Sequence, residues 1–415
     1  MFGEYYNQYT PDYIKAIKKH HNKYKIKLEI LGYYENVVGE IVKDLSVTAQ
    51  GQINVNYQPI MRRSCSLTLI NVDKKYIPSP DNVFWLERKF RLWIGVVDNF
   101  ASGTPDIYWW SQGVFFTQSA TSDGNTVNIE AVDKGGALNG TLGMNIIDTQ
   151  YIVPSGTNIS KLVRDTLMLS IADTPSDKPN GSCKPIDPIT PVIDIKYNNI
   201  LTQSEISIDA NNCIGDIFEA ITEGYNADLY YDTYGCFQLK ELTTGYRVDG
   251  YKYMACQWEY NDNDAFYGAS NFTYNFDGKN TVTVYTNASG IENVSYTAYN
   301  RNPASPIRTA NVGVRRMQSK EIKYVNVSEN EMAKLCKQYA DYLLIQEAMR
   351  GASVTFNSPI IPHLDVNRTI TITDKKQKLE HEIFIIQSIT IPLSSEMMSI
   401  SATSINWLPN NLIMG

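Results

Sequence analysis

The sequence predicts a mainly β protein that contains a smaller part of mixed α and β structure. Tyrosine is the dominant aromatic residue, with 28 Tyr against 13 Phe, and tyrosine suits the half-exposed surface of a sheet. Alternation of apolar and polar residues recurs in both the first and the last third of the chain, whereas helical spacing is confined to a few segments. At roughly 100–200 residues per domain, a chain of 415 residues is long enough for two to four domains.

The composition excludes several classes of protein. Hydrophobic residues make up 43% of the chain, which is enough to bury real cores and excludes wholesale disorder. The net charge is −7, so general binding to nucleic acid or to anionic membranes is not expected. No apolar run approaches the roughly 18–20 residues of a membrane span, and no secretory signal pattern is present. We therefore expect the chain to stay in the cytoplasm where it is made, or to be delivered without a signal.

The first third predicts an N-terminal arm and a β-barrel. In the arm, residues 1–22, Thr10 can cap a short helix whose first position is Pro11. Residues 23–135 are interpreted as a first antiparallel barrel, because strand periodicity recurs with turn signals between the strands and no helix intervenes. The predicted strands lie at 25–31, 46–57, 65–70, 90–96, 108–116 and 126–132.

The middle of the chain, residues 136–255, predicts a mixed α+β inserted domain. A helix begins near Thr157, and a proline-rich linker at 174–191 follows it. A second short helix is predicted at 212–223. Directly after it, strands 227–231 and 236–242 form a hairpin.

The last part, residues 256–415, predicts a second antiparallel barrel with one helix laid across it. A capping box, in which Ser328 is followed three residues later by Glu331, begins a helix at 328–350. The turn signal at 277–280 predicts a hairpin of the two strands on either side of it. The predicted strands are 270–276, 281–285, 322–327, 352–357, 368–373, 382–391 and 397–404. No sequence repeat relates the two barrels.

A search for nucleophilic or metal-dependent chemistry finds no catalytic motif. The four histidines are His20, His21, His363 and His381, and none lies in a nucleophile elbow or a zinc-protease helix. We expect His381 at a surface position on a strand. The cysteines form no CxxC pair, which predicts small buried side chains and no zinc site; they are Cys65, Cys183, Cys213, Cys236, Cys256 and Cys336.

Other candidates are equally unspecific, and we assign no catalytic, cofactor-binding or metal-binding residue. Glu219 and Glu223 lie on the polar face of a short helix, and Asp262 and Asp264 resemble only part of a calcium loop. The glycine-rich segment 135–140 lacks the Gly-Lys-Ser/Thr of a phosphate-binding loop. The aromatic pairs predict strand or interface positions rather than stacking of sugars or bases; they are Tyr33–Tyr34, Trp109–Trp110 and Tyr230–Tyr231.

The order of these segments resembles the hub proteins of phage tail baseplates and related injection machines. Four stretches carry the resemblance. The first is 108–116 followed by 127–133, an aromatic and Gly-Val-Phe passage that leads to an Ala-x-Asp ending. The second is 154–167. The third is the helix and hairpin at 217–237. The fourth comprises the helix 328–350, the passage 359–373 and the strands near 386–403.

The resemblance implies a structural protein with two tail-tube-like barrels and no enzymatic activity or cofactor. Its homotrimer would form a pseudo-sixfold ring in the baseplate of a virion tail that is assembled in the host bacterial cytoplasm. The ring would bind the tail tube protein above, a central spike or tip protein below and other baseplate proteins at its sides. DNA would pass through the channel without sequence-specific binding.

Two other classes of protein stay open. One is a distal-tail or receptor-facing adaptor of a non-contractile tail, which shares the barrels. The other is a carbohydrate-active β protein, which would need a pocket with paired acids. The oligomeric state separates a hub, which forms a ring, from a monomeric glycan-cleaving enzyme.

Overall fold

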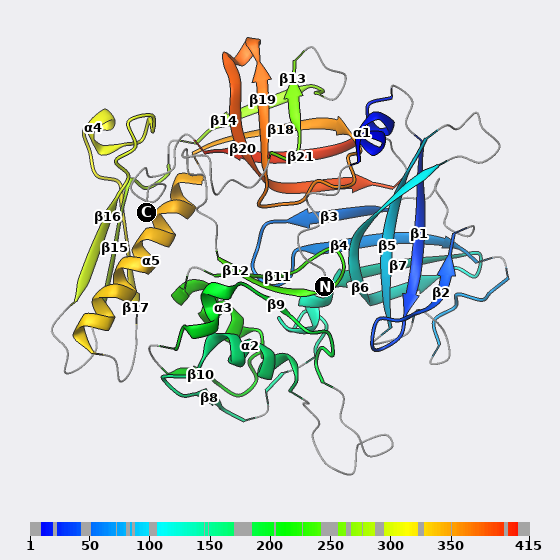
Figure 1. Ribbon diagram of the computed structural model, residues 1–415, viewed down its shortest axis with the longest axis horizontal. Helices are drawn as coiled ribbons and strands as arrows, with labels where there is room; N and C mark the ends of the chain where they lie inside the picture. The colour runs from blue at the N-terminus through cyan, green and yellow to red at the C-terminus, as the bar shows by residue number, and fades with distance from the viewer. Residues whose placement is uncertain are drawn as a thin grey trace.

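The computed structural model describes most of the chain (Figure 1). The described residues are 10–19, 23–42, 51–71, 73–79, 84, 88–98, 106–144, 146–147, 149–169, 185–202, 205–225, 227–241, 256–262, 267–275, 277–286, 294–322, 328–349, 351–393 and 397–405.

The main body is one thirteen-stranded, mostly antiparallel sheet. Its strands run in the order β14-β18-β21-β20-β3-β4-β7-β6-β5-β1-β2, with β19 beside β20 and β13 beside β19. The first third of the chain contributes β1 (Lys23–Leu31), β2 (Val37–Ile41), β3 (Gln52–Asn56), β4 (Arg63–Ile70), β5 (Lys89–Val97), β6 (Ile107–Ser122) and β7 (Thr126–Asp133). The last third contributes β13 (Glu259–Asn261), β14 (Ser270–Tyr274), β18 (Ala352–Pro359), β19 (Thr369–Asp374), β20 (Leu379–Pro392) and β21 (Met397–Ser404). The predicted mainly β class is confirmed.

The two strand-rich parts share this sheet because β3 pairs with β20. Val55 lies opposite Ile389 and Ile53 opposite Ile391, and all four side chains are buried. A single apolar core continues across this seam, from Leu28 and Phe90 on one side to Ile386 and Ile400 on the other. The alternation that predicted the strands therefore serves one continuous core, which ties the two parts into one body.

The short N-terminal helix α1 (Pro11–Ile17) forms where predicted. The Thr10 hydroxyl accepts a hydrogen bond from the Tyr13 N–H at 3.2 Å, which is the expected N-cap. Tyr13, Ala16 and Ile17 are buried against the sheet core. The predicted C-terminal end of this helix, residues 20–22, lies outside the described residues.

The middle region is a mixed α+β unit, as predicted, and it lies below the large sheet in Figure 1. Its main helices are α2 (Ile159–Leu167) and α3 (Asp216–Tyr225), whose apolar faces pack on a hairpin of β11 (Ala227–Tyr231) and β12 (Phe237–Glu241). Asn158 rather than Thr157 caps α2. Smaller elements complete the unit: η2 (Lys134–Ala137), β8 (Tyr151–Val153), β9 (Val192–Ile193), η4 (Ile195–Asn199) and β10 (Ile206–Ile208).

The hairpin predicted across 277–280 is wrong. The strand before the turn, β14, pairs with β18 in the large sheet, whereas the strand after it, β15 (Thr281–Thr286), belongs to a separate sheet. That sheet has the order β16-β15-β17, with β16 (Ser295–Tyr299) and β17 (Met317–Ile322). Asn280 fixes the start of β15 in this second sheet, where its buried side chain donates to the carbonyls of Ile307 and Val314, next to the short helix α4 (Thr309–Val312). A turn signal predicts a change of direction but not which strand becomes the partner.

The long helix α5 (Glu329–Met349) begins with the predicted capping box. The Ser328 hydroxyl accepts from the Glu331 N–H at 3.4 Å, and the Glu331 carboxylate accepts from the Ser328 N–H at 3.1 Å. Along most of its length α5 packs on Val282 and Val284 of the small sheet. Its last turn packs on Ile385 of the large sheet, so the helix connects the two sheets.

Candidate functional site

A group of buried charged residues lies where the first part of the large sheet, the middle unit and the last part of the sheet meet. We call this region the junction; its charged members are Glu35, Arg62, Arg63, Lys89, Asp133, Lys134, Asp187, Asp228 and Asp365. Buried charges are tolerated when they are paired and hydrogen-bonded. These contacts therefore determine how the three parts are held together.

Asp133 ends β7 and organises the backbone around it. One carboxylate oxygen, Oδ2, accepts from the N–H groups of Arg62 and Arg63 at 2.8 and 2.7 Å, and Oδ1 accepts from the Gly135 N–H at 2.9 Å. Burial raises the pKa of Asp133 to about 6, against the lowering effects of the Arg63 charge and of these N–H donors. Asp133 closes the Ala-x-Asp passage in which the sequence resembles tail hubs.

The Arg62 side chain connects the large sheet to the middle unit. Its Nη2 forms an ion pair with Asp228 of β11, and its guanidinium carbon lies 3.7 Å from the centroid of the Tyr230 ring. The other carboxylate oxygen of Asp228 accepts from the Asn367 side chain at 3.1 Å. Asp228 thus receives donors from both strand-rich parts of the chain.

The Arg63 side chain connects all three parts. Its Nη2 lies 2.6 Å from Asp365 Oδ1, in the last part of the chain, and its Nη1 donates to the Tyr231 carbonyl at 2.9 Å, in the middle unit. Only 2% of Arg63 is exposed, so these bonds form out of reach of competing water.

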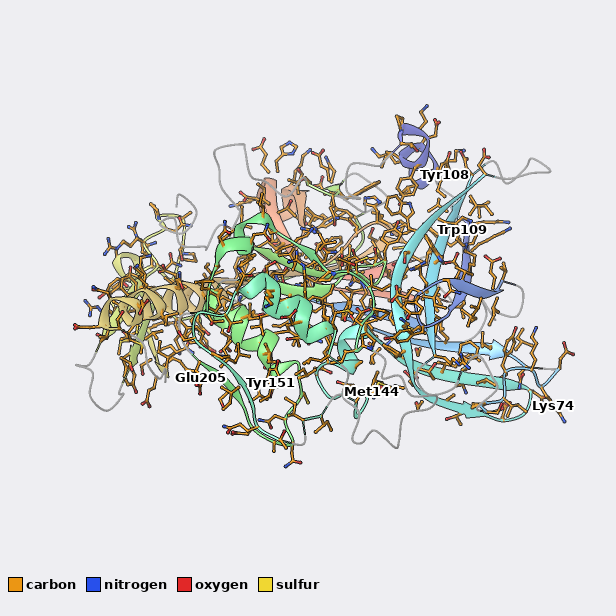
Figure 2. All side chains as sticks on the ribbon, turned by 60° about the horizontal axis from the view of Figure 1, so that its bottom comes forward. Lys74, Tyr108, Trp109, Met144, Tyr151 and Glu205 are labelled. Carbon is orange, nitrogen blue, oxygen red and sulfur yellow. The ribbon has the colours of Figure 1, made fainter. Side chains whose placement is uncertain are left out.

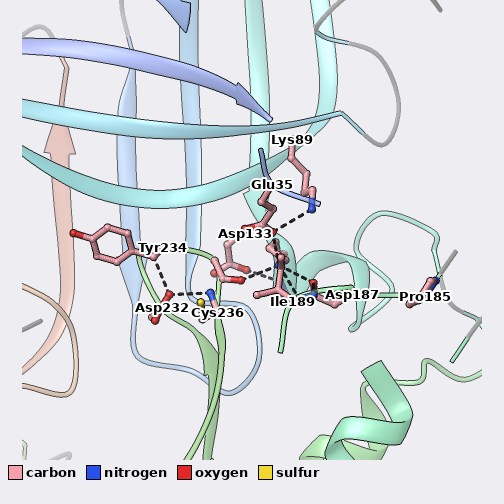
Figure 3. Close-up of polar contacts among 12 residues, drawn as sticks. Glu35, Lys89, Asp133, Pro185, Asp187, Ile189, Asp232, Tyr234 and Cys236 are labelled. Carbon is pink, nitrogen blue, oxygen red and sulfur yellow. Dashed lines mark hydrogen bonds and ion pairs between the residues drawn. The ribbon is translucent and has the colours of Figure 1, made fainter. Parts of the chain in front are cut away.

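Lys134 and Lys89 form a second set of ion pairs, and Figure 3 shows Glu35, Lys89 and Asp187 of this set. Lys134 Nζ lies 2.5 Å from Glu35, 2.8 Å from Asp187 and 2.8 Å from the Gly235 carbonyl. Lys89 Nζ lies 3.1 Å from the same Glu35 carboxylate. Burial by itself would lower the pKa of Lys134, but the charges of Asp187 and Glu35 outweigh it, and the pKa is raised. Lys134 therefore stays protonated and links the β1–β2 turn to the middle unit.

The glycine-rich segment after Asp133 serves packing. A Cβ atom on Gly135 would lie 2.3 Å from the Ile60 carbonyl oxygen, so only glycine permits this approach of the two backbones. Ile60 in turn donates its N–H to the Leu229 carbonyl of β11 at 2.8 Å. The segment is a short 3₁₀ turn that seats the middle unit, in agreement with its lack of a phosphate-loop sequence.

A buried histidine joins the N-terminal helix to the last part of the chain. His363 Nδ1 lies 2.9 Å from the Tyr13 hydroxyl, and Nε2 lies 3.2 Å from the Gln257 carbonyl oxygen. The Trp110 and Trp258 rings pack near the imidazole, at 5.7 and 5.9 Å between centroids. Burial lowers the pKa of His363 to about 4. Nothing in the sequence around His363 marks it, because its partners come from distant segments.

We expect His363 to make the protein less stable in acid. Because its pKa is about 4 in the folded chain and ordinarily 6.5, the stability it contributes is complete above pH 6.5 and is lost as the pH falls toward 4. The loss should reach up to about 3 kcal/mol. Urea unfolding from pH 4 to 7 should show a steeper decline below pH 6.5 for the wild type than for His363→Gln.

The difference between wild type and variant isolates His363 in this experiment. The wild-type profile alone does not, because the raised pKa of Asp133 acts oppositely and reduces stability as the pH rises from about 4 to 6. Parallel profiles for the two proteins would contradict the prediction.

The structure places the sequence candidates apart from the junction. His381 is exposed on β20, as predicted, with Nδ1 3.1 Å from Glu259. Glu219 and Glu223 are exposed on α3. Asp262 accepts from the Lys375 N–H at 3.1 Å, whereas Asp264, His20 and His21 lie outside the described residues. No group of three or more His, Cys, Asp or Glu side chains in the described part of the chain could hold a metal ion.

The aromatic pairs occupy contacts between elements. Tyr230 lies buried under Arg62, and Trp110 packs on Tyr13 at 4.9 Å. Figure 2 shows Tyr108 beside α1 and Tyr151 and Glu205 on the middle unit. The five cysteines in described segments are free thiols: Cys65, Cys236 and Cys336 are buried, Cys213 is half-buried and Cys256 is exposed. Cys183 lies outside those segments.

The junction thus holds three chain segments in one arrangement, and the fold it maintains defines a class. That class is a mainly β fold with two strand-rich parts in one sheet and an inserted α+β unit. No helix of the described residues is long and apolar enough to cross a membrane.

Three solved structures share this fold over nearly their whole length. The 43 kDa tail protein of prophage MuSo2 from Shewanella oneidensis is 13% identical with a TM-score of 0.57, over 92% of this chain and 99% of that one. A tail protein from Neisseria meningitidis is 10% identical with a TM-score of 0.59, and the match covers 93% of this chain and 98% of that one. A prophage tail protein from Listeria monocytogenes is 11% identical with a TM-score of 0.51, over 94% and 97%.

Comparisons of sequence alone find no counterpart: no protein-family model matches the chain, and no curated protein matches it. The likeness is therefore one of fold, and at that level the resemblance to tail proteins is confirmed.

Proposed function

We propose that this chain is a structural hub of a phage tail baseplate. Three copies form a ring that joins the hexameric tail tube to the central spike and surrounds part of the DNA path. The observation that carries the proposal is the fold, which three tail proteins share over nearly their whole length. The role is architectural and not enzymatic.

The junction supports this role physically. A hub that holds tube and spike in register needs its own parts fixed relative to one another, and buried ion pairs such as Arg63–Asp365 and Lys134–Asp187 are costly to separate. Two strand-rich parts in each chain would give a trimer six similar units, which matches a hexameric tube. In this proposal the boundaries are 1–22 for the arm, 23–135 and 256–415 for the tube-like units, and 136–255 for the insert.

The edges of the large sheet suit assembly into a ring. β14 lies at one end of the sheet and β2 at the other. On β2, Val37 and Val38 are 53% and 61% exposed, and exposed apolar edge strands are typical places for pairing between chains. Hub interfaces of this kind are large, on the order of 2,000 Å² or more, and relatively apolar.

The test measures stoichiometry and position together. Mass photometry of the purified protein should give a trimer. Electron microscopy of tail particles should place three copies where the tail tube meets the spike. A protein that stays monomeric at every accessible concentration, or that lies elsewhere in the particle, would overturn the proposal.

A further inference from the structure

One face of the small sheet β16-β15-β17 is covered by α5, and the opposite face has the character of an interface. The opposite face carries Thr283, which bonds the Thr297 hydroxyl at 2.9 Å and contacts the Met317 sulfur at 3.7 Å. Met317 is 57% exposed and Tyr285 is 36% exposed. Aromatic residues and methionine are enriched at the centres of protein interfaces.

The same face has a basic border. Arg301 and Arg315 approach the ring of Tyr299 at 5.6 and 5.5 Å, and Tyr299 lies opposite Thr281 of β15. Neither arginine forms an ion pair within the described residues. The face also carries one acidic residue, Glu321, which lies opposite Tyr285. The two arginines therefore leave an unpaired positive border at the Tyr299 end of the face.

The matching charges lie on the middle unit. The helix α3 carries three acidic residues, Asp216, Glu219 and Glu223, and no Lys, Arg or His. On α3, Glu219 and Glu223 are exposed, and burial together with the charges of Asp216 and Glu223 raises the pKa of Glu219. These carboxylates repel one another in the free chain, so an approaching cationic surface would be stabilised.

One chain cannot bring its own two surfaces together. The helix α5 contacts α3 as well as β15 and β16, so it stands between the acidic helix and the small sheet. The small sheet lies at one end of the molecule, and α3 lies below its centre (Figure 1). A head-to-tail interface requires two different, complementary surfaces on one chain. Such contacts close into a ring when the rotation between neighbouring copies is a whole fraction of a turn.

We propose that the face of the small sheet bordered by Arg301 and Arg315 docks onto the acidic face of α3 in a neighbouring copy of the chain. This inference rests on the proposed trimer and identifies one of its contacts. The Tyr285 and Met317 side chains supply the apolar centre, and the arginines supply the charged rim that fixes the register.

The test reverses the charges on each side. Sedimentation velocity of the full chain over a concentration series should show that R301E/R315E raises the apparent dissociation constant of the trimer at least about 100-fold. D216K/E219K/E223K should have a similar effect, and the chain carrying both sets should regain most of the wild-type association.

The control is K375E/K376E in the 3₁₀ turn η5 (Lys375–Gln377), whose exposed lysines belong to neither surface. This variant should associate like the wild type. Circular dichroism confirms folding of each variant.

The outcomes separate this inference from the hub proposal. A trimer that persists in R301E/R315E overturns the inference and leaves the trimer intact, whereas a monomeric wild type overturns both. Loss of the trimer in each reversed variant without recovery in the combined chain also overturns the inference. So does binding of labelled duplex DNA that R301E/R315E abolishes while the trimer persists, because the surface would then serve nucleic acid.

Discussion

Replacing Arg63 by methionine is expected to lower the free energy of unfolding by about 3–5 kcal/mol. The change removes the Arg63 guanidinium that lies 2.6 Å from the buried Asp365 carboxylate and that donates to the Tyr231 carbonyl. Both groups are shielded from water, so solvent cannot replace the lost bonds. Chemical denaturation of the purified variant measures the change.

Two comparisons show whether loss of the Arg63–Asp365 ion pair causes the decrease in stability. Arg88→Met removes an exposed arginine that forms no ion pair within the described residues, and it should change stability by less than about 0.5 kcal/mol. Combining Arg63→Met with Asp365→Asn should lower the free energy of unfolding by roughly 1–3 kcal/mol less than the sum of the single changes. The reason is that the second change removes the negative charge of the buried Asp365 carboxylate. Additive effects would show that Arg63 and Asp365 contribute independently.

The second large effect is expected at Lys134. Lys134→Met leaves two buried carboxylates, Glu35 and Asp187, without the ammonium group that lies between them. We expect a loss of about 3–5 kcal/mol, and we expect the middle unit to loosen first because Asp187 loses its only cationic partner in the described structure. Denaturation gives the magnitude, and hydrogen exchange of the segments around Asp187 and Gly235 locates it.

Lys89→Met is the matched control, because it removes a buried lysine from the same Glu35 carboxylate. Glu35 then keeps Lys134 at 2.5 Å, and Asp187 is not affected. The loss should be smaller, about 1–2 kcal/mol, and hydrogen exchange around Asp187 should not change. Equal losses for both lysines would mean that the Asp187 pair does not anchor the middle unit.

Sequence patterns predicted the helices and strands whose formation depends on residues close together in the chain. The Thr10 cap, the Ser328–Glu331 capping box and the strict alternation at 25–31 each lie within one short segment, and each formed as expected. The 277–280 hairpin failed because strand partners are chosen by tertiary packing: Val282 and Val284 bury against α5, which begins more than forty residues later. Strand β2 was missed, since its five residues Val37–Ile41 do not alternate strictly between apolar and polar.

The junction was only partly visible in the sequence. Asp133 lay in a recognised passage, yet its role as acceptor for Arg62 and Arg63 could not be inferred. Arg62 and Asp228 are 166 positions apart, and Arg63 and Asp365 are 302 positions apart. No periodicity extends over such separations, so only the folded chain shows which charges become partners.

By itself the sequence determined that the chain is mainly β and where its capped helices α1 and α5 begin, because backbone preference and side-chain alternation act over a few residues. The tertiary structure decided that both strand-rich parts share one sheet through β3 and β20 and that buried arginines and lysines hold the middle unit against them. These features arise because charged and apolar residues that are far apart in the sequence become buried against one another. That burial takes place only when the whole chain has folded.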